Sequence, residues 1–380
     1  MYIRLQTFEG IGRESAFLWG ARQTGKTTLL KHLFPDSIYI DLLLNSEFLR
    51  FTQNQDLLSQ IVEVNQTNKP VIIDEIQRIP QLLNEIHWLI TNKSVQFILS
   101  GSSPRNILRS GVNLLGGRAL RYELYPFVFN EIENFDLVKA LNFGLIPRHY
   151  LSANPKKLIS AYIGSYLKDE ISAEAKLRNI NAFAKFLESA AFSNGEIVNY
   201  SNIATDCGVS SVTVKEYFQI LEDTLIGRFL PAYTKKAKRR VISSPKFYFF
   251  DIGIANFLLK RHNIDFRSES FGSAFEHFIY LELFAHSRYS DLNYDISYWR
   301  TASQIEVDFI LGDAEIALEV KATEMISSRH IKSLKQFADE FKPKRLIVVS
   351  NDKYYRKMED VEIMPYAFFL KELWSGRIII

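Results

Sequence analysis

The sequence predicts an α/β protein: a doubly wound parallel sheet in the N-terminal part, a helical segment in the middle and a second α/β domain at the C-terminus. Short apolar segments alternate with helical periodicity over residues 15–124, which is typical of a parallel sheet. A glycine-rich loop joins the first apolar segment to the first helical one. Near the C-terminus, two alternating segments flank Gly312 and Asp313, which predicts a hairpin.

The glycine-rich loop lies between a predicted buried strand at residues 15–20 and a predicted helix at 27–33. It matches G-x-x-x-x-G-K-[ST], the phosphate-binding P-loop. The glycines let the backbone curl around an anion, while the helix N-terminus and Lys26 add positive charge. Thr27 is expected to supply a hydroxyl to Mg²⁺. The sequence therefore predicts ATP and Mg²⁺ at Gly20, Ala21, Arg22, Gln23, Thr24, Gly25, Lys26, Thr27 and Thr28.

Two acids follow a predicted strand at residues 70–73. In P-loop enzymes the first acid at such a strand end holds Mg²⁺ through water, and the next one polarises the attacking water. We therefore expect Asp74 to serve the metal and Glu75 to activate the water. Acids also favour a helix N-terminus, and this second role is compatible with the first.

Further candidates follow the predicted strand at residues 95–100. A small polar residue at its tip is expected to touch the γ-phosphate or orient the water, and Ser102 and Ser103 fit equally. Arginines then cluster at positions 105, 109, 118 and 121. An arginine that reaches the γ-phosphate stabilises transition-state charge, and we expect Arg118 to do so from the same or a neighbouring chain. A solvent-facing arginine is the alternative.

The order of four segments, GARQTGKTTL, VIIDEIQ, ILSGSSPRN and LLGGRALRYELYPF, resembles the AAA-type ATPases of bacteria and archaea in a family of uncharacterised ATP-binding proteins. The resemblance extends to about Lys321. It implies ATP, Mg²⁺ and a C-terminal domain of unknown function, and it supplies no substrate.

Residues 136–195 have a helical pattern and predict a connector, and residues 196–245 predict a winged helix. Ser201 and Ser210 are expected to cap two helices, with Gly208 in the turn between them. We expect the basic run that follows to bind DNA phosphates, with little reading of bases. A structural lid or a protein-contact module is the alternative. The basic residues are Lys235, Lys236, Lys238, Arg239 and Arg240.

A two-residue turn at Gly312–Asp313 would place residue 311 opposite 314, 308 opposite 317, and 306 opposite 319. Glu306 would then face Glu319 across the two strands. Like charges at facing positions destabilise a strand pair, and a divalent cation bound by carboxylates relieves this repulsion. A solvated polar face is the alternative. One face would be apolar, with Ile305, Val307, Phe309, Leu311, Ile316, Leu318 and Val320. The other would carry Glu306, Asp308, Glu319 and Lys321.

The spacing of Asp308 and Glu319-x-Lys321 resembles the restriction-endonuclease-like superfamily. The resemblance implies a nuclease-type fold and a second Mg²⁺ or Mn²⁺ held by Asp308 and Glu319. Glu276, on a predicted helix at 271–286, would add a carboxylate, and Lys321 would help to activate water. Metal-dependent DNA cleavage is the activity this resemblance implies.

The predicted division is an AAA-type ATP-binding domain at 1–135, a helical connector at 136–195, a winged helix at 196–245 and a restriction-endonuclease-like domain at 246–380. A single cysteine, Cys207, and the lack of a signal-like N-terminus or of an apolar run near ~20 residues lead us to expect a cytoplasmic protein without a membrane partner.

The function expected from these features is ATP hydrolysis that drives or gates a DNA-handling C-terminal half, with nuclease activity as an open part. The alternative is an ATP-dependent regulatory switch that binds DNA or a partner protein without cleaving it. The net charge of +3 does not decide between them. A homo-oligomer or a partner protein is compatible with both.

Overall fold

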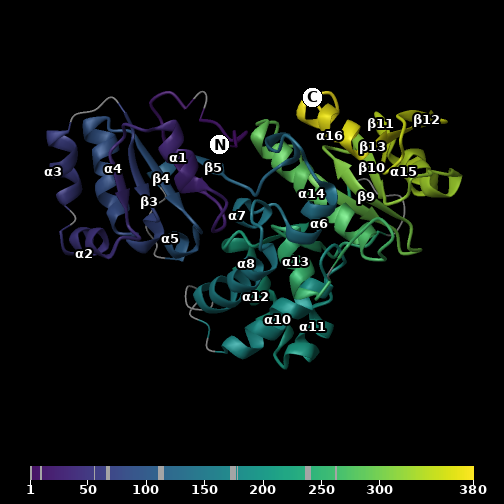
Figure 1. The fold of residues 1–380 in the computed structure, drawn as a ribbon, viewed down its shortest axis with the longest axis horizontal. Helices are drawn as coiled ribbons and strands as arrows, with labels where there is room; N and C mark the ends of the chain where they lie inside the picture. Colours follow the sequence, from purple (N-terminus) through teal and green to yellow (C-terminus); the bar gives the residue numbers. More distant parts are fainter. Residues whose placement is uncertain are drawn as a thin grey trace. The chain divides into compact units, whose positions relative to one another are not determined.

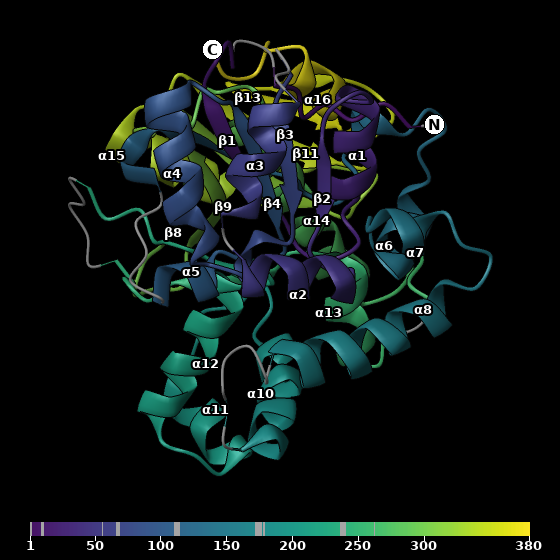
Figure 2. The ribbon, with the colours of Figure 1, turned by 90° about the vertical axis from the view of Figure 1, so that its left-hand side faces the viewer.

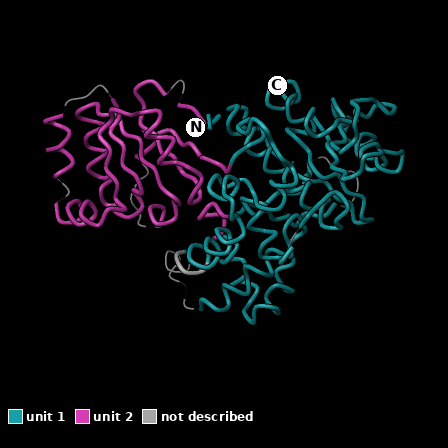
Figure 3. Tube along the Cα trace, viewed as in Figure 1, with its two compact units in different colours: residues 1–5, 127–219, 227–380 teal, residues 6–126, 220–226 magenta. Residues whose placement is uncertain are grey.

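The computed structural model describes residues 2–8, 11–54, 56–65, 69–109, 115–171, 177, 179–235, 241–261 and 263–380, without the side chains of 168–170. The chain forms two compact units (Figure 3). We call residues 6–126 with 220–226 the N-terminal unit, and residues 1–5, 127–219 and 227–380 the C-terminal unit. Among the described residues, no helix is long and apolar enough to cross a membrane.

The N-terminal unit contains the predicted parallel sheet, with five strands in the order β2-β3-β4-β1-β5 (Figure 1). Both faces are covered: Leu29 and Leu30 of α1 pack on one face, and Leu82 and Ile86 of α4 on the other. The strands are β1 (Ser15–Trp19), β2 (Tyr39–Asp41), β3 (Val71–Asp74), β4 (Phe97–Gly101) and β5 (Ala119–Glu123). The α-helices are α1 (Lys26–Leu33), α2 (Asn45–Gln53), α3 (Leu57–Val64), α4 (Leu82–Lys93) and α5 (Arg105–Arg109), with 3₁₀ turns η1 (Ile76–Arg78) and η2 (Leu115–Gly117). The doubly wound sheet predicted from the alternating pattern is confirmed.

The C-terminal unit begins with helices, of which α10, α11 and α12 gather side by side (Figures 1 and 2). Phe183 and Phe186 of α10 pack against Tyr217 of α12. The elements are η3 (Phe129–Glu131), α6 (Leu137–Phe143), α7 (Pro147–Tyr150), α8 (Pro155–Ala161), the π-helix η4 (Tyr162–Glu170), α10 (Ile180–Phe192), α11 (Tyr200–Cys207), α12 (Ser211–Asp223) and α13 (Ile252–Leu258). The last residues of α12 belong to the N-terminal unit.

The turn between α11 and α12 follows the predicted pattern in part. Gly208 ends α11 in the left-handed region, with φ of 66°, and the Ser210 hydroxyl accepts a hydrogen bond from Thr213 N (3.1 Å). The predicted cap at Ser201 is wrong, because Asn199 caps α11 through its carboxamide oxygen. Asn199 and Ser201 are both of capping type and lie two positions apart, and local sequence does not choose between them.

After α12, strand β6 (Gly227–Leu230) pairs antiparallel with β7 (Lys246–Phe249). The sequence places residues 246–251 as the opening strand of the last domain, but β7 pairs with β6 and not with the C-terminal sheet. Strand pairing depends on tertiary contacts that an isolated apolar segment does not contain. Of the predicted basic run, Lys235 is exposed, and the other four residues lie outside the described residues.

The C-terminal sheet has six strands in the order β12-β13-β11-β10-β9-β8 and is mixed in direction. Helices α14 and α16 contribute to the core on one face, and α15 contributes to the core on the other. The strands are β8 (Ile296–Arg300), β9 (Glu306–Leu311), β10 (Ile316–Lys321), β11 (Arg345–Ser350), β12 (Arg356–Met358) and β13 (Val361–Pro365). The helices are α14 (Phe271–Tyr289), α15 (Lys332–Phe341), α16 (Tyr366–Trp374) and the 3₁₀ turn η5 (Ser328–Ile331).

The predicted hairpin of β9 and β10 exists, but its predicted register is wrong by two residues. Leu311 pairs with Ile316, and Ile310 pairs with Ala317. The connection is the four-residue segment 312–315, in which Gly312 and Ala314 have positive φ and Glu315 N donates to Leu311 O. A longer turn with two left-handed residues replaces the two-residue turn, so the position of glycine alone did not determine the register.

The predicted single apolar face is also wrong, because β9 has a bulge. Pairing with β8 changes from Ser297–Ile310 to Trp299–Val307, which leaves Asp308 and Phe309 together opposite one residue of β8. Consequently Val307 packs in the core with α15, whereas Phe309 packs in the core with α14. The bulge places Asp308 at the irregular point of the strand.

A buried carboxylate joins α13 to the loop before α7. Asp251 accepts hydrogen bonds from the backbone N–H groups of Leu145 (2.7 Å), Ile146 (3.1 Å) and Ile254 (3.2 Å). Gly144 has φ of 73°, and a Cβ there would collide with the Asp251 carboxylate. The carboxylate therefore provides the acceptor for three buried backbone N–H groups.

We expect Asp251→Ala to lower the free energy of unfolding by about 3 kcal/mol or more, because three buried N–H groups lose their acceptor. The measurement is urea denaturation followed by circular dichroism. Asp265→Ala is the control, because that exposed aspartate also accepts a backbone N–H bond, from Arg267. Equal losses in the two variants would contradict the assigned role of Asp251.

A second buried carboxylate, Glu282 of α14, accepts hydrogen bonds from Phe129 N and Trp374 Nε1, both at 2.8 Å. Burial raises the pKa of Glu282 to about 8 even though these two donors lower it. Because the folded pKa lies above the ordinary value, the folded state holds the proton more tightly. The resulting stabilisation is present in acid and is lost as pH rises through about 8.

Glu282→Gln should remove this pH dependence, because the amide does not ionise. We expect the unfolding midpoint of the wild type to fall more steeply between pH 5 and pH 9 than that of the variant, by thermal denaturation at several pH values. Glu133→Gln, at an exposed position, is the control and should follow the wild type. Parallel curves for wild type and Glu282→Gln would refute the prediction.

Candidate functional site

The P-loop joins β1 to α1, and the structure requires glycine at two of its positions for different reasons. A Cβ on Gly20 would lie 2.5 Å from Leu124 O, because the chain after β5 approaches the loop closely. Gly25 precedes α1 with φ of 98°, in the left-handed region that glycine adopts without strain. Together they bring backbone N–H groups and the start of α1 to one place.

Lys26 is buried, and its ammonium lies inside the loop. Its Nζ donates to Gly20 O (2.6 Å) and Ala21 O (3.3 Å). Burial lowers the pKa of Lys26, while the nearby charges of Glu75 and Asp74 oppose that shift. A phosphate in the loop would offer this ammonium a full negative charge in place of carbonyl dipoles.

Asp74 at the end of β3 is the hub of the polar contacts beside the loop. Its Oδ2 accepts from the hydroxyls of Thr27 (2.6 Å) and Tyr39 (2.5 Å). Its Oδ1 accepts from the Ser100 hydroxyl and from Glu75 N. The Thr27 hydroxyl and the Asp74 carboxylate are hard oxygen donors in contact, which fits Mg²⁺.

Glu75 follows Asp74 with φ of 60° and is buried. Gln77 Nε2 donates both to the Glu75 carboxylate and to the Ser102 hydroxyl, the latter at 2.9 Å. Ser102 is therefore linked to Glu75 through one side chain. The positive φ at Glu75 is a strained conformation for this residue type, and the contact with Gln77 orients its carboxylate.

Ser103 has a different environment, although the sequence did not separate it from Ser102. Its hydroxyl accepts from Arg105 N (3.1 Å) and donates to Asp223 O (3.2 Å) at the end of α12. Arg105 is 2 % exposed and forms an ion pair with the Asp223 carboxylate. Leu225 packs against the core of the same unit. These contacts attach residues 220–226 to the N-terminal unit.

Arg118 does not lie near the P-loop. β5 runs parallel to β1 with Ala119 beside Ser15 and Glu123 beside Trp19, so Arg118 lies at the opposite edge of the sheet. Five residues of strand separate the two edges, about 16 Å. The expectation that Arg118 acts within its own chain is therefore wrong, and only the contribution to a neighbouring chain stays open as a prediction. The sequence does not show which edge a strand presents until its pairing is known.

Tyr39 and Ser100 contact Asp74 but were absent from the predicted site. Ser100 lies directly beside Asp74 in the parallel register of β3 and β4. Its position at a strand end, level with the acid of the next strand, is a signal that the sequence contains. Tyr39 begins a short strand and offers no comparable signal.

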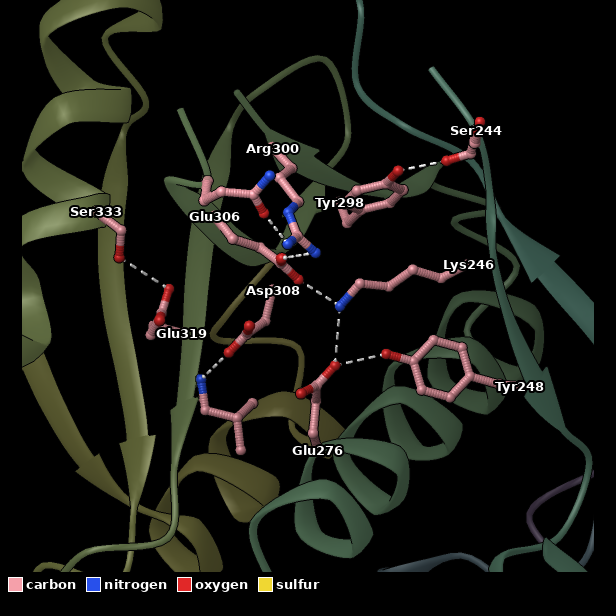
Figure 4. A network of polar contacts seen from close by, with 12 residues as sticks. Ser244, Lys246, Tyr248, Glu276, Tyr298, Arg300, Glu306, Asp308, Glu319 and Ser333 are labelled. Carbon is pink, nitrogen blue, oxygen red and sulfur yellow. Dashed lines mark hydrogen bonds and ion pairs between the residues drawn. The ribbon is translucent and has the colours of Figure 1, made fainter. Parts of the chain in front are cut away.

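In the C-terminal unit, carboxylates from two elements meet a buried lysine (Figure 4). Lys246 Nζ lies 3.3 Å from Glu276 Oε1 and 2.5 Å from Glu306 Oε1. The Tyr248 hydroxyl donates to Glu276 Oε1 (2.6 Å), and Arg300 pairs with Glu306 Oε2 (3.0 Å). The Lys246 side chain is only 3 % exposed.

Asp308 and Glu319 lie at the point where β9 and β10 stop pairing. Asp308 Oδ2 accepts from Val320 N (2.7 Å), so the aspartate side chain replaces a partner carbonyl in the ladder. Glu319 pairs with Lys321 (2.5 Å) and accepts from the Ser333 hydroxyl (3.2 Å). Burial, together with Glu319 and Glu276, raises the pKa of Asp308, and burial raises that of Glu319.

The predicted residues Glu276, Asp308, Glu319 and Lys321 thus come together. With Glu306 the region has four carboxylates, of which Glu276 and Glu306 contact Lys246 and Glu319 contacts Lys321. Within the part of the chain that the structure describes, no group of three or more His, Cys, Asp or Glu side chains is arranged to hold a metal ion. The expected second metal is therefore not supported. Lys246 was absent from the predicted site, because a single lysine in an aromatic segment carries no recognisable spacing.

Of the five residues predicted to bind nucleic acid, the structure describes only Lys235. Its exposed ammonium lies 3.4 Å from Asp313 Oδ1, an exposed ion pair. Lys236, Lys238, Arg239 and Arg240 lie outside the described residues.

Three family models match successive parts of the chain: an AAA domain over residues 12–133, a domain of unknown function (DUF8612) over 134–265, and a second (DUF4143) over 271–369. Uncharacterized proteins of Mycobacterium bovis and Mycobacterium tuberculosis are each 24% identical over 327 residues, which is 83% of this chain and 72% of theirs. An uncharacterized protein of Methanocaldococcus jannaschii is 23% identical over 397 residues, covering 92% of this chain and 86% of its own.

Two solved structures are similar in part. The Aeropyrum pernix ORC1 protein in complex with DNA has 12% identity and a TM-score of 0.24, covering 65% of this chain and 86% of its own. A signal transduction ATPase (STAND) protein with a tetratricopeptide repeat sensor from Pyrococcus horikoshii has 14% identity and a TM-score of 0.22, covering 75% and 46%. The AAA domain match, together with the P-loop, supports a P-loop ATPase of AAA type within residues 12–133.

Proposed function

We propose that the chain is a Mg²⁺-dependent ATPase whose nucleotide state gates a DNA-handling C-terminal unit. The observation that carries the ATPase part is the contact of the Thr27 hydroxyl with Asp74 (2.6 Å), directly beside Lys26 and Glu75. Thr27 and Asp74 would hold Mg²⁺, which neutralises phosphate charge. Lys26 binds phosphate oxygens, and the Glu75 carboxylate accepts the proton of the attacking water.

The gating part is supported by the loop after β4. Ser102 is linked through Gln77 to Glu75, and the next residue, Ser103, bonds to Asp223 at the end of α12. Of these adjacent residues, Ser102 is therefore linked through Gln77 to the proposed water-activating group, and Ser103 contacts the helix of the predicted winged segment directly. A shift of this loop with nucleotide state would alter both contacts together.

DNA handling rests on the predicted winged helix and its basic run, and the division into four domains stays part of the proposal. Nuclease activity is a second candidate, favoured by Asp308 and Glu319 at the fork of β9 and β10 with Lys321 beside them. The regulatory switch is favoured by the lysines paired with Glu306 and Glu319, since a switch has no need of a metal there.

We expect Lys26→Ala to abolish ATP hydrolysis and Glu75→Gln to lower kcat by about 100-fold or more while ATP binding persists, because the base contributes to the chemical step. Phosphate release and binding of a fluorescent ATP analogue are the measurements. Lys93→Ala and Glu63→Gln, which break an exposed ion pair (3.2 Å) of the same unit, are the controls. Wild-type rates in either site variant would exclude this site as the hydrolytic centre.

The DNA-handling function and the regulatory switch predict different effects of DNA on the rate of ATP hydrolysis. For the favoured function we expect duplex, single-stranded or branched DNA to stimulate ATP hydrolysis, and charge reversal in the basic run to remove the stimulation because phosphate contacts are lost. Flat rates across the panel would favour the switch. Cleavage of labelled DNA with Mg²⁺ or Mn²⁺ that Asp308→Ala abolishes would support the nuclease, and no cleavage of any substrate would count against it.

A further inference from the structure

The Lys246 side chain is buried, and the carboxylates around it explain why it stays charged. Burial alone disfavours an ammonium, but Glu276, Glu306 and Asp308 more than compensate and raise the pKa of Lys246. Its Nζ lies within 3.3 Å of carboxylate oxygens from α14 and from β9, two elements that are separate in the chain. The ammonium therefore neutralises two carboxylates that would otherwise repel each other.

The strand that carries this lysine is fixed to the edge of the C-terminal sheet. Leu230 of β6 pairs with Lys246, while Ile242 N donates to Arg300 O (2.9 Å). The Tyr298 hydroxyl donates to Ser244 O two residues before Lys246. These contacts fix the position from which the Lys246 side chain extends toward Glu306. β7 itself lies outside the sheet to which Glu306 belongs.

The restriction-endonuclease-like resemblance implies a divalent cation held by Asp308 and Glu319 with Glu276, and the carboxylates of Glu276 and of neighbouring Glu306 do not fit one as they lie. Glu276 Oε1 binds Lys246 and the Tyr248 hydroxyl, while both oxygens of Glu306 bind cations, Lys246 and Arg300. Mg²⁺ requires carboxylate oxygens at about 2.0–2.1 Å in near-octahedral geometry, and these oxygens are turned toward the Lys246, Arg300 and Tyr248 donors instead.

We propose that Lys246 is a tethered cation that takes the place of a divalent metal at Glu276 and Glu306. The ammonium supplies the positive charge that this part of the site needs, and the β6–β7 strand pair holds it there. The inference uses the proposed carboxylate site only for its location, since it concerns which cation neutralises that site and not whether DNA is cleaved.

The test replaces the cation and supplies a metal. Lys246→Met keeps the length of the side chain and removes its charge, and Mn²⁺ without nucleotide is titrated against the protein by electron paramagnetic resonance. We expect the variant to bind one Mn²⁺ per chain more than the wild type does, and the double variant Lys246→Met with Glu306→Gln to lose that gain. Any Mn²⁺ at the P-loop cancels in the comparison.

Two further variants serve as controls. Lys246→Arg keeps a cation in place and should gain no Mn²⁺, and Lys335→Met removes the exposed partner of Glu359 and should gain none either. If Lys246→Met folds poorly, Mn²⁺ should raise its Tm by more than it raises the Tm of Lys246→Arg.

Equal Mn²⁺ binding by wild type and Lys246→Met would overturn the proposal, as would a Lys246→Met protein that Mn²⁺ fails to stabilise. Because neither measurement uses ATP or DNA, an inactive ATPase or the absence of cleavage would count against the proposed function and leave this inference intact.

Discussion

The buried carboxylate of Asp74 needs hydrogen-bond donors, and the arrangement of the N-terminal site follows from the way it obtains them. Thr27 comes from the start of α1, Tyr39 from β2 and Ser100 from β4, so one side chain joins three elements. A parallel sheet makes this possible because the carboxyl ends of its strands meet at one edge. The P-loop lies at the same edge, which brings the phosphate-binding loop and its acid into contact.

The C-terminal unit meets the same requirement by other means. Asp251 is satisfied by backbone N–H groups, Glu282 keeps its proton near neutral pH, and Glu276 with Glu306 obtains an ammonium from Lys246. Each solution avoids an unpaired buried charge, which is the costly alternative. The carboxylates that the hairpin spacing suggested for a metal are thus partly neutralised by the protein itself.

Within the N-terminal unit, the loop after β4 contacts the end of α12. Ser102 and Ser103 are adjacent in sequence, but one is bonded to Gln77 and the other to Asp223. Arg105 strengthens the second contact, because its buried guanidinium pairs with the Asp223 carboxylate. A nucleotide-dependent change at Glu75 would have a short path through Gln77 and this loop to the end of α12.

Local sequence was sufficient for the P-loop, the parallel strands and the pairing of β9 with β10, because each depends on residue types at short spacing. The restriction-endonuclease-like resemblance also brought Glu276, Asp308, Glu319 and Lys321 into one candidate site. The tertiary structure alone decided the hairpin register, the bulge at Asp308, the distance of Arg118 from the P-loop and the different partners of Ser102 and Ser103. It also decided that Lys246 reaches Glu306. These features depend on which strands pair and which charges meet across long separations in the chain, and no short window of sequence contains that information.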